Sequence, residues 1–187
     1  MDIRLVSYAG LHEALFGMGF SYGLTSNLKS WNEVDLDLLE RLLKVAKSLA
    51  NKDGGHNCFL EQIILYFDIK APRYWWQQFD RYKIGTARLS ESTMHTLGKR
   101  QLTKLDFENG EQIPEEYFTF INKMDDSRID MKGFLLESFL QRRMCLVSMK
   151  ALKNMYNQRR GHALPEWQKF CDYCESSVPY FREWFLQ

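Results

Sequence analysis

The sequence has few of the residues that mark secreted, membrane-bound or multidomain proteins. Its 187 residues include only four prolines and four cysteines, and 25 Lys and Arg nearly balance 24 Asp and Glu. Four cysteines without a secretion signal are too few for a disulfide framework, so we expect reduced thiols and a cytoplasmic protein. The formal net charge of +1 excludes a surface that is cationic throughout, so we do not expect nucleic acid as a partner.

Long apolar runs and domain linkers are also missing. Apolar stretches such as residues 134–139 are far shorter than the ~20 residues that a membrane-spanning helix needs, so no membrane contact is expected. No internal repeat, low-complexity tract or Pro/Ser-rich linker interrupts the chain. We therefore expect residues 1–187 to form a single domain, a length sufficient for one sizeable core.

The clearest periodic patterns predict a helix, a strand and a second helix in succession. Ser30 and Glu33 have the spacing of a capping box, and apolar residues then recur at helical spacing over 34–49. Apolar residues alternate with polar ones over 63–69, which predicts a half-buried strand that ends at Ala71-Pro72. Trp75, Trp76, Phe79 and Tyr82 follow at spacings of three and four, which predicts a helix that runs into Lys83.

The other segments carry weaker patterns. Residues 8–29 are rich in glycine and predict loops with short elements, and residues 98–115 predict a polar connector around Asn109-Gly110. Residues 134–156 have a long helical pattern, broken at most once, and Pro165 opens a final amphipathic helix to about Gln187. The sequence therefore predicts a mainly helical protein with at least one strand.

Several groups of residues are open to both a structural and a chemical interpretation. Aromatic residues make up 14% of the chain and can stack a ligand or fill a core or subunit interface. Cys171 and Cys174 form a C-x-x-C that is typical of a redox pair, half a zinc site or two buried thiols, and we favour buried thiols because no second Cys/His pair accompanies them. Arginines and lysines over residues 142–160 indicate a solvated face or an anion site.

A more specific arrangement lies at the end of the second predicted helix. Gln78, Arg81 and Lys83 are followed by a polar segment, residues 86–95, that is rich in hydroxyl groups. Side-chain donors beside backbone amides in an irregular segment suit a phosphorylated ligand. No P-loop or dinucleotide-fold motif is present in the sequence.

Residues 55–97 and 132–170 carry motifs that resemble the flavin-dependent thymidylate synthase family, also called thymidylate synthase complementing proteins. In the first segment, a histidine-led strand, an Ala-Pro turn and a helix end precede residues 81–94, which align without a gap with the family signature R-H-R-x-x-S-x-N-E-x-S-x-R-Y. The second resembles the family's V-L-P segment, its T-x-N-A-R-S-L helix and the arginine that closes L-x-L-R. The resemblance implies an α/β (α+β) protomer, with a central, mainly antiparallel sheet flanked by helices, that assembles as a homotetramer with flavin at subunit junctions.

The resemblance also implies ligands and the residues that hold them. In the family, reduced FAD supplies the hydride, methylenetetrahydrofolate supplies the carbon, NADPH is a co-substrate, and no protein nucleophile takes part. FAD would then be bound by His56, Arg81, Tyr82, Lys83 and Lys150. The uracil nucleotide, dUMP in the family, would be bound by Gln78, Arg81, Ser90, Ser92, Lys132 and Arg159.

This sequence departs from the family signature at several positions. Tyr82 replaces the signature histidine, Glu91 replaces its serine, and Ser148 replaces an asparagine in the second segment. The dipeptides at 88–89 and 93–94 replace the family's Asn-Glu and Arg-Tyr. Ser90 or Ser92 would have to supply the lost hydroxyl, and Arg88 the lost cation.

Two hypotheses of different classes follow from the resemblance. The first is an enzyme, an FAD-dependent methyltransferase of the thymidylate synthase type that transfers a one-carbon unit to dUMP. The second is a catalytically inactive protein of the same fold that is retained to bind a nucleotide, a flavin or a partner protein. A zinc- or nucleic-acid-binding interaction protein ranks third, because it depends only on the C-x-x-C and the basic residues.

Overall fold

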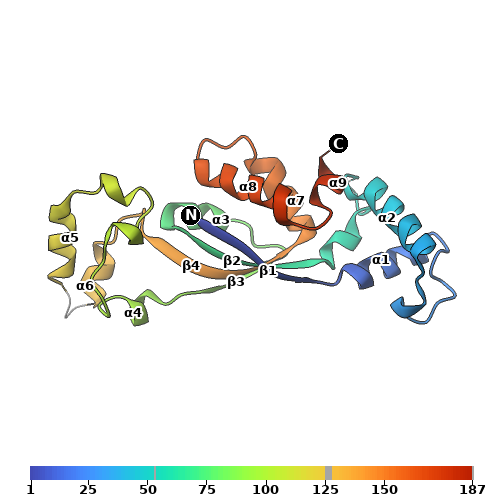
Figure 1. The fold of residues 1–187 in the computed structure, drawn as a ribbon, viewed down its shortest axis with the longest axis horizontal. Helices are drawn as coiled ribbons and strands as arrows, with labels where there is room; N and C mark the ends of the chain where they lie inside the picture. The colour runs from blue at the N-terminus through green and yellow to red at the C-terminus, as the bar shows by residue number, and fades with distance from the viewer. Residues whose placement is uncertain (53, 125–127, 187) are drawn as a thin grey trace. The chain divides into compact units, whose positions relative to one another are not determined.

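The computed structural model describes residues 1–52, 54–124 and 128–186. Four strands form one antiparallel sheet in the order β1-β2-β4-β3 (Figure 1). Their bounds are β1 Asp2–Ala9, β2 Ile64–Pro72, β3 Thr86–Ser90 and β4 Leu140–Ser148. This confirms the predicted α/β class with a central antiparallel sheet flanked by helices.

The chain divides into two compact units. The first unit comprises Met1–Arg4, Asp68–Tyr82 and Arg88–Met144. The second comprises Leu5–Phe67, Lys83–Ala87 and Cys145–Gln187.

Strand β2 lies where the alternating pattern predicts it. Leu65, Phe67 and Ile69 are completely buried, whereas Asp68 and Lys70, on the opposite parity, are half-buried. Because successive side chains of a strand point to opposite faces, one face of β2 lies in the core and the other carries polar groups. The predicted strand is therefore confirmed.

In the first unit, helix α3 (Arg73–Phe79) follows β2 directly. Pro72 caps its N-terminus in an extended conformation, and the helix buries Trp75, Trp76 and Phe79. The two tryptophan rings meet edge to face at 4.9 Å, a favourable aromatic geometry. The helix ends at Phe79, so the expectation that it runs into Lys83 is wrong.

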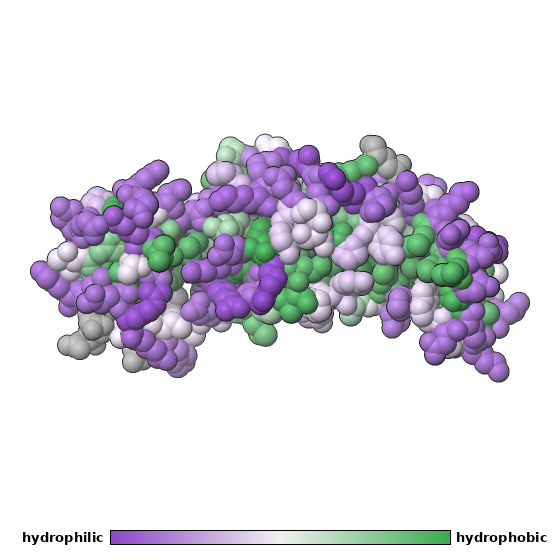
Figure 2. All heavy atoms as spheres, viewed as in Figure 1, coloured by the Kyte–Doolittle hydropathy of each residue, from purple (hydrophilic) through white to green (hydrophobic). Residues whose placement is uncertain are grey.

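A second hydrophobic cluster of the first unit gathers around three short helices. These are α4 (Thr93–Thr96), α5 (Glu115–Asn122) and α6 (Arg128–Gly133). Leu102 and Phe107 are buried in this cluster, so the expectation of a polar connector over 98–115 is wrong at both positions. Hydrophilic side chains predominate over the α5–α6 segment on the face drawn in Figure 2, with hydrophobic ones visible between them.

The second unit contains most of the helical residues. Its helices are α1 (Leu11–Phe20), α2 (Leu36–Ala50), α7 (Met149–Arg159), α8 (Pro165–Ser177) and α9 (Phe181–Phe185). The capping box of Ser30 and Glu33 forms, but it closes a 3-10 turn, and Asp35 caps α2 by accepting a hydrogen bond from the Leu38 amide. The predicted helix therefore exists but starts later than its capping signal suggests.

Three other expectations for the second unit are corrected by the structure. A ten-residue helix, α1, forms in the glycine-rich segment where loops with short elements are expected, and Gly19 packs closely against Thr25. Residues 134–156 are not one helix, because strand β4 precedes α7 and Ser148 caps that helix by accepting from the Ala151 amide. The last predicted helix stops before Pro179, whose ring disfavours a helical conformation in the residue before it, and α9 then begins separately.

Gly85 is required by the turn that leads into β3. Its φ is +70°, and an added Cβ would lie 2.5 Å from the Ser148 hydroxyl oxygen. Its carbonyl accepts a hydrogen bond from the Ser148 amide at 2.7 Å. The turn therefore fits against the start of α7 only because residue 85 has no side chain.

A row of alternating charges crosses three neighbouring strands in the first unit. The Asp68 carboxylate on β2 accepts hydrogen bonds from Arg4 on β1 at 2.8 Å and from Arg142 on β4 at 2.7 and 2.6 Å. Cross-strand pairs of opposite charge stabilise a sheet register. The hydrogen bond from Arg142 is the largest cause that lowers the pKa of Asp68, and Arg4 adds to it.

Within the described part of the chain, no helix is both long and apolar enough to cross a membrane.

Substituting Asp68 tests the charge row. Because the pKa of Asp68 is lower in the folded than in the unfolded chain, its ionised form stabilises the fold above the unfolded pKa, and this stabilisation is lost as the pH falls through the folded pKa. Asp68→Asn should lower the free energy of unfolding at neutral pH by about 1 kcal/mol, since solvent screens both exposed arginines. Urea unfolding should show the difference shrinking below about pH 4. Asp2→Asn, which removes an exposed carboxylate from β1, should change the stability much less, and an equal loss in both variants would contradict the prediction.

Candidate functional site

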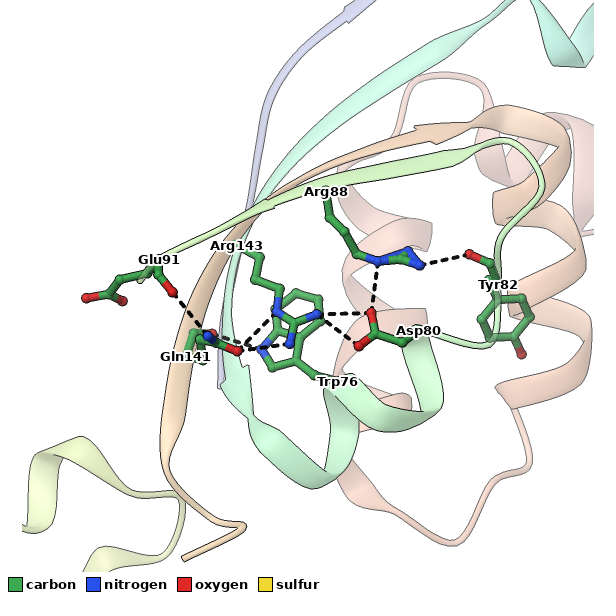
Figure 3. A network of polar contacts seen from close by, with 7 residues as sticks. All are labelled: Trp76, Asp80, Tyr82, Arg88, Glu91, Gln141 and Arg143. Atoms are coloured by element: carbon green, nitrogen blue, oxygen red, sulfur yellow. Dashed lines mark hydrogen bonds and ion pairs between the residues drawn. The ribbon is translucent and has the colours of Figure 1, made fainter. Parts of the chain in front are cut away.

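A network of polar contacts in the first unit centres on the Asp80 carboxylate, just after α3 (Figure 3). Asp80 accepts from the Arg88 Nε of β3 at 2.8 Å and from the Arg143 Nη1 of β4 at 3.0 and 3.1 Å. Both arginine side chains are less than one-fifth exposed. The carboxylate therefore joins the end of α3 to two strands through charge-assisted hydrogen bonds, which are stronger than neutral ones.

Aromatic and amide groups complete this network. The Arg143 guanidinium lies over the Trp76 ring at 4.5 Å, and the Trp76 indole donates to the Gln141 carbonyl at 2.9 Å. The Gln141 side chain accepts from Arg143 at 2.9 Å and donates to the Glu91 carbonyl at 3.1 Å. Figure 3 shows the Glu91 carboxylate pointing away from these contacts. The network thus fixes the backbone on both sides of the polar segment that follows α3.

Arg88 is fully engaged in the same network. In addition to Asp80, it donates to the Tyr82 carbonyl at 3.4 Å and lies over the Phe79 ring at 5.6 Å. The sequence suggested Arg88 as a substitute for the cation that Thr93 replaces. The structure instead gives Arg88 an intramolecular carboxylate partner.

The remaining candidates of the first unit lie on its surface or at the end of α3. Gln78 and Tyr82 are half-buried, and the Arg81 amide donates to the Gln78 carbonyl at 3.3 Å, so these residues share one turn. The other candidates have exposed side chains: Arg81, Ser90, Ser92 and Lys132. Across residues 1–52, 54–124 and 128–186, neither Arg81 nor Lys132 forms an ion pair.

The second unit holds the other predicted site residues in different surroundings. His56 is exposed and, with Tyr22, lines a pocket of about 640 Å³ near α1. Lys150 donates to the Glu61 carboxylate at 2.5 Å, and the Arg159 guanidinium lies over the Trp167 ring at 4.8 Å. The fourth candidate, Lys83, is exposed in the turn before β3.

The predicted site residues are divided between the two units. Gln78 and Arg81 are neighbours in the first unit, whereas Lys83 and Arg159 belong to the second. A single anion-binding pocket formed by all four residues stays a prediction.

Sequence analysis did not single out Asp80, Trp76 or Gln141 as a network with Arg143. The available signal was Asp80, which directly follows a helix of buried aromatic residues. A charged group in such surroundings needs a partner, so this position predicts an ion pair. Its partners lie on β3 and β4, and β4 was expected to be helical, so the pattern alone could not identify them.

Cys171 and Cys174 lie on α8, and both are buried. Burial raises the pKa of the Cys171 thiol to about 11 and that of Cys174 well above its usual value. Both thiols are therefore protonated near neutral pH, whereas a metal ion binds thiolates. In the part of the chain that the structure describes, no group of three or more His, Cys, Asp or Glu side chains could hold a metal ion.

Metal analysis tests the assignment of these two thiols. Tag-free protein should contain no stoichiometric zinc, and the Cys171→Ser/Cys174→Ser variant should have the same metal content, because two buried thiols cannot complete a tetrahedral site. Stoichiometric zinc that disappears on replacing both cysteines would contradict this.

Replacing the central carboxylate tests the network of Figure 3. Asp80→Asn leaves two mostly buried guanidinium groups facing a neutral amide, so the free energy of unfolding should fall by about 2 kcal/mol. Chemical denaturation measures the change, and Asp172→Asn on the exposed side of α8 is the matched control. A loss at Asp80 no larger than at Asp172 would show that the network contributes little.

Comparison with known proteins was made at the level of sequence and of structure. No protein-family profile matches the sequence, and no curated protein matches it either. Two solved structures of the flavin-dependent thymidylate synthase ThyX from Helicobacter pylori, each with FAD and dUMP, match with a TM-score of 0.76 and 17% sequence identity. The match covers 100% of this chain and 98% of the ThyX chain. At this identity the likeness shows the fold alone: the chain has a ThyX-like fold over its whole length.

Proposed function

We propose that the protein is a divergent ThyX-like protein that binds FAD and a uracil nucleotide. The proposal is carried by one observation: the chain resembles ThyX both in its fold and in sequence motifs that lie within the matched region. The fold matches ThyX throughout, and the motif residues Gln78, Arg81 and Arg159 occur in the family's order in the sequence. The ThyX structures contain FAD and dUMP, and both ligands carry phosphate groups.

The described residues fit phosphorylated ligands in part. Arg81 and Lys83 are exposed, and neither forms an ion pair with a described residue, so their donors are available to phosphate oxygens. Gln78 carries an amide that can both donate to and accept from a pyrimidine edge. Lys150 would need to exchange its contact with Glu61 for a ligand contact.

Bound FAD would supply the hydride, and the protein would supply positioning and charge. Arg81 and Lys83 would neutralise phosphate, and Gln78 would orient the base. Arg159 would present its guanidinium edge while its face lies over Trp167. A homotetramer, with flavin at the subunit junctions, is part of this proposal, as are NADPH and methylenetetrahydrofolate as co-substrates of an active enzyme.

The contacts around residues 86–95 favour binding with weak or absent methylation of dUMP. Arg88 is bound to Asp80, and the Glu91 backbone is held by hydrogen bonds to β4. Neither residue can move freely to replace the groups that the family signature has there. A misplacement of about 1 Å can reduce a rate on the order of a hundredfold, so the catalytically inactive ThyX-fold protein is the second candidate.

The absorption spectrum of the purified protein tests flavin binding. Protein reconstituted with FAD should be yellow after desalting, and Arg81→Ala should weaken FAD or dUMP binding roughly tenfold, because a charge-assisted contact is lost. Arg41→Ala, an exposed arginine of α2, is the matched control. Absence of bound flavin together with unchanged dUMP binding in Arg81→Ala would contradict the proposal.

Tritium release from C5 of dUMP distinguishes the two candidate functions. With FAD, NADPH and methylenetetrahydrofolate present, we expect little or no release above background. Turnover that both Arg81→Ala and Arg159→Ala abolish would instead establish the enzyme.

A further inference from the structure

A pocket of about 470 Å³ in the first unit has a cationic wall and none of the residues that the proposed function assigns to FAD or the nucleotide. It lies beside β2, β4 and the segment that follows α4. Its cationic side chains are Lys70, Lys99, Arg100 and Arg142. The volume is within the range of sites for small molecules.

The two arginines are held in place by hydrogen bonds to carboxylates. Asp68 binds Arg142 through two guanidinium nitrogens. Asp106 binds Arg100 and is fixed in turn by the Thr103 amide at 2.9 Å. A guanidinium has five N–H donors, so each arginine retains donors for a ligand. These charges are therefore positioned before any ligand arrives, which lowers the entropy cost of binding.

The two lysines supply charge that the protein does not neutralise. Lys70 is half-buried on β2, and Lys99 is exposed. Among the described residues, neither side chain has a hydrogen-bond or ion-pair partner. A half-buried ammonium group without a carboxylate partner favours an anion from solution.

The base of the pocket is apolar. Leu97, Leu102 and Phe139 line it, and all three are buried members of the hydrophobic cluster of the first unit. Four cations beside an apolar surface suit a ligand with a charged end and a flat or aliphatic body, because each part finds matching surroundings.

Glu91 is the one carboxylate of the lining besides Asp106. The hydrogen bonds that Arg100 donates to Asp106 and Arg142 donates to Asp68 are the main causes that raise the pKa of the two arginines, and the Glu91 charge adds to both. Glu91 is therefore near both arginines, where it opposes an incoming anion.

We propose that this pocket binds a small organic phosphate monoester, with the phosphate on Lys70, Lys99 and the two arginines and its organic part on Leu97, Leu102 and Phe139. A dianionic phosphate matches several converging cations better than a single carboxylate does. Its lining contains none of the residues that the proposed function assigns to FAD or the nucleotide, although Glu91 stands between two of them, Ser90 and Ser92, in the sequence.

Phenyl phosphate is the probe, and its binding is followed by titration calorimetry of the full chain. Lys70→Gln and Lys99→Gln should each weaken binding roughly tenfold, since each removes a charge-assisted contact. Inorganic phosphate should bind more weakly than phenyl phosphate, because it lacks the part that covers the apolar base. Lys47→Gln, an exposed lysine of α2, is the matched control and should bind like the unmodified protein.

Glu91→Gln keeps the backbone contacts of Glu91 and removes only its opposing charge, so it should tighten phenyl phosphate binding several-fold. A variant that folds poorly would lose binding, so tighter binding cannot be explained by poor folding. Unchanged binding in Glu91→Gln and Lys70→Gln would overturn the pocket assignment. Binding that Arg81→Ala weakens and Lys70→Gln does not would place phenyl phosphate at the proposed nucleotide site instead, which would overturn this inference and leave the proposed function standing.

Discussion

The Asp80 carboxylate is the contact on which the polar structure of the first unit depends. It binds Arg88 of β3 and Arg143 of β4, two guanidinium groups that are mostly buried beside aromatic rings. A buried cation without a partner is strongly unfavourable, so the carboxylate determines where both strands can lie against α3. The positions of Trp76 and Gln141 follow from the same arrangement.

Carboxylate partners divide the cationic side chains into those with a structural role and those that are available to ligands. Arg88 and Arg143 form ion pairs with Asp80, and Arg4 forms one with Asp68. Arg81 and Lys70 have no such partner among the described residues. A chain with a net charge of +1 can therefore still present local anion sites, because its carboxylates are concentrated on particular arginines rather than spread evenly.

The structural likeness to ThyX concerns the fold and does not extend to the ligand chemistry. The fold is shared over the full chain at 17% identity, because a sheet and its covering helices need only the correct apolar pattern and volume. Ligand chemistry needs particular groups at particular places. Residues 86–95 differ from the family signature in sequence, and Arg88 and the Glu91 backbone are held by contacts within the chain.

The sequence by itself determined the elements whose signal is local. The alternation over 63–69 gave β2, the spacing of Trp75, Trp76 and Phe79 gave α3, and the motif positions led to the correct fold class. Tertiary structure decided the rest. Residues 140–148 are a strand because neighbouring strands satisfy their backbone groups, and α1 is a helix because packing outweighs its glycines. Arg143, a partner of Asp80, comes from a segment distant in the chain, and no local pattern records which segments the fold brings together.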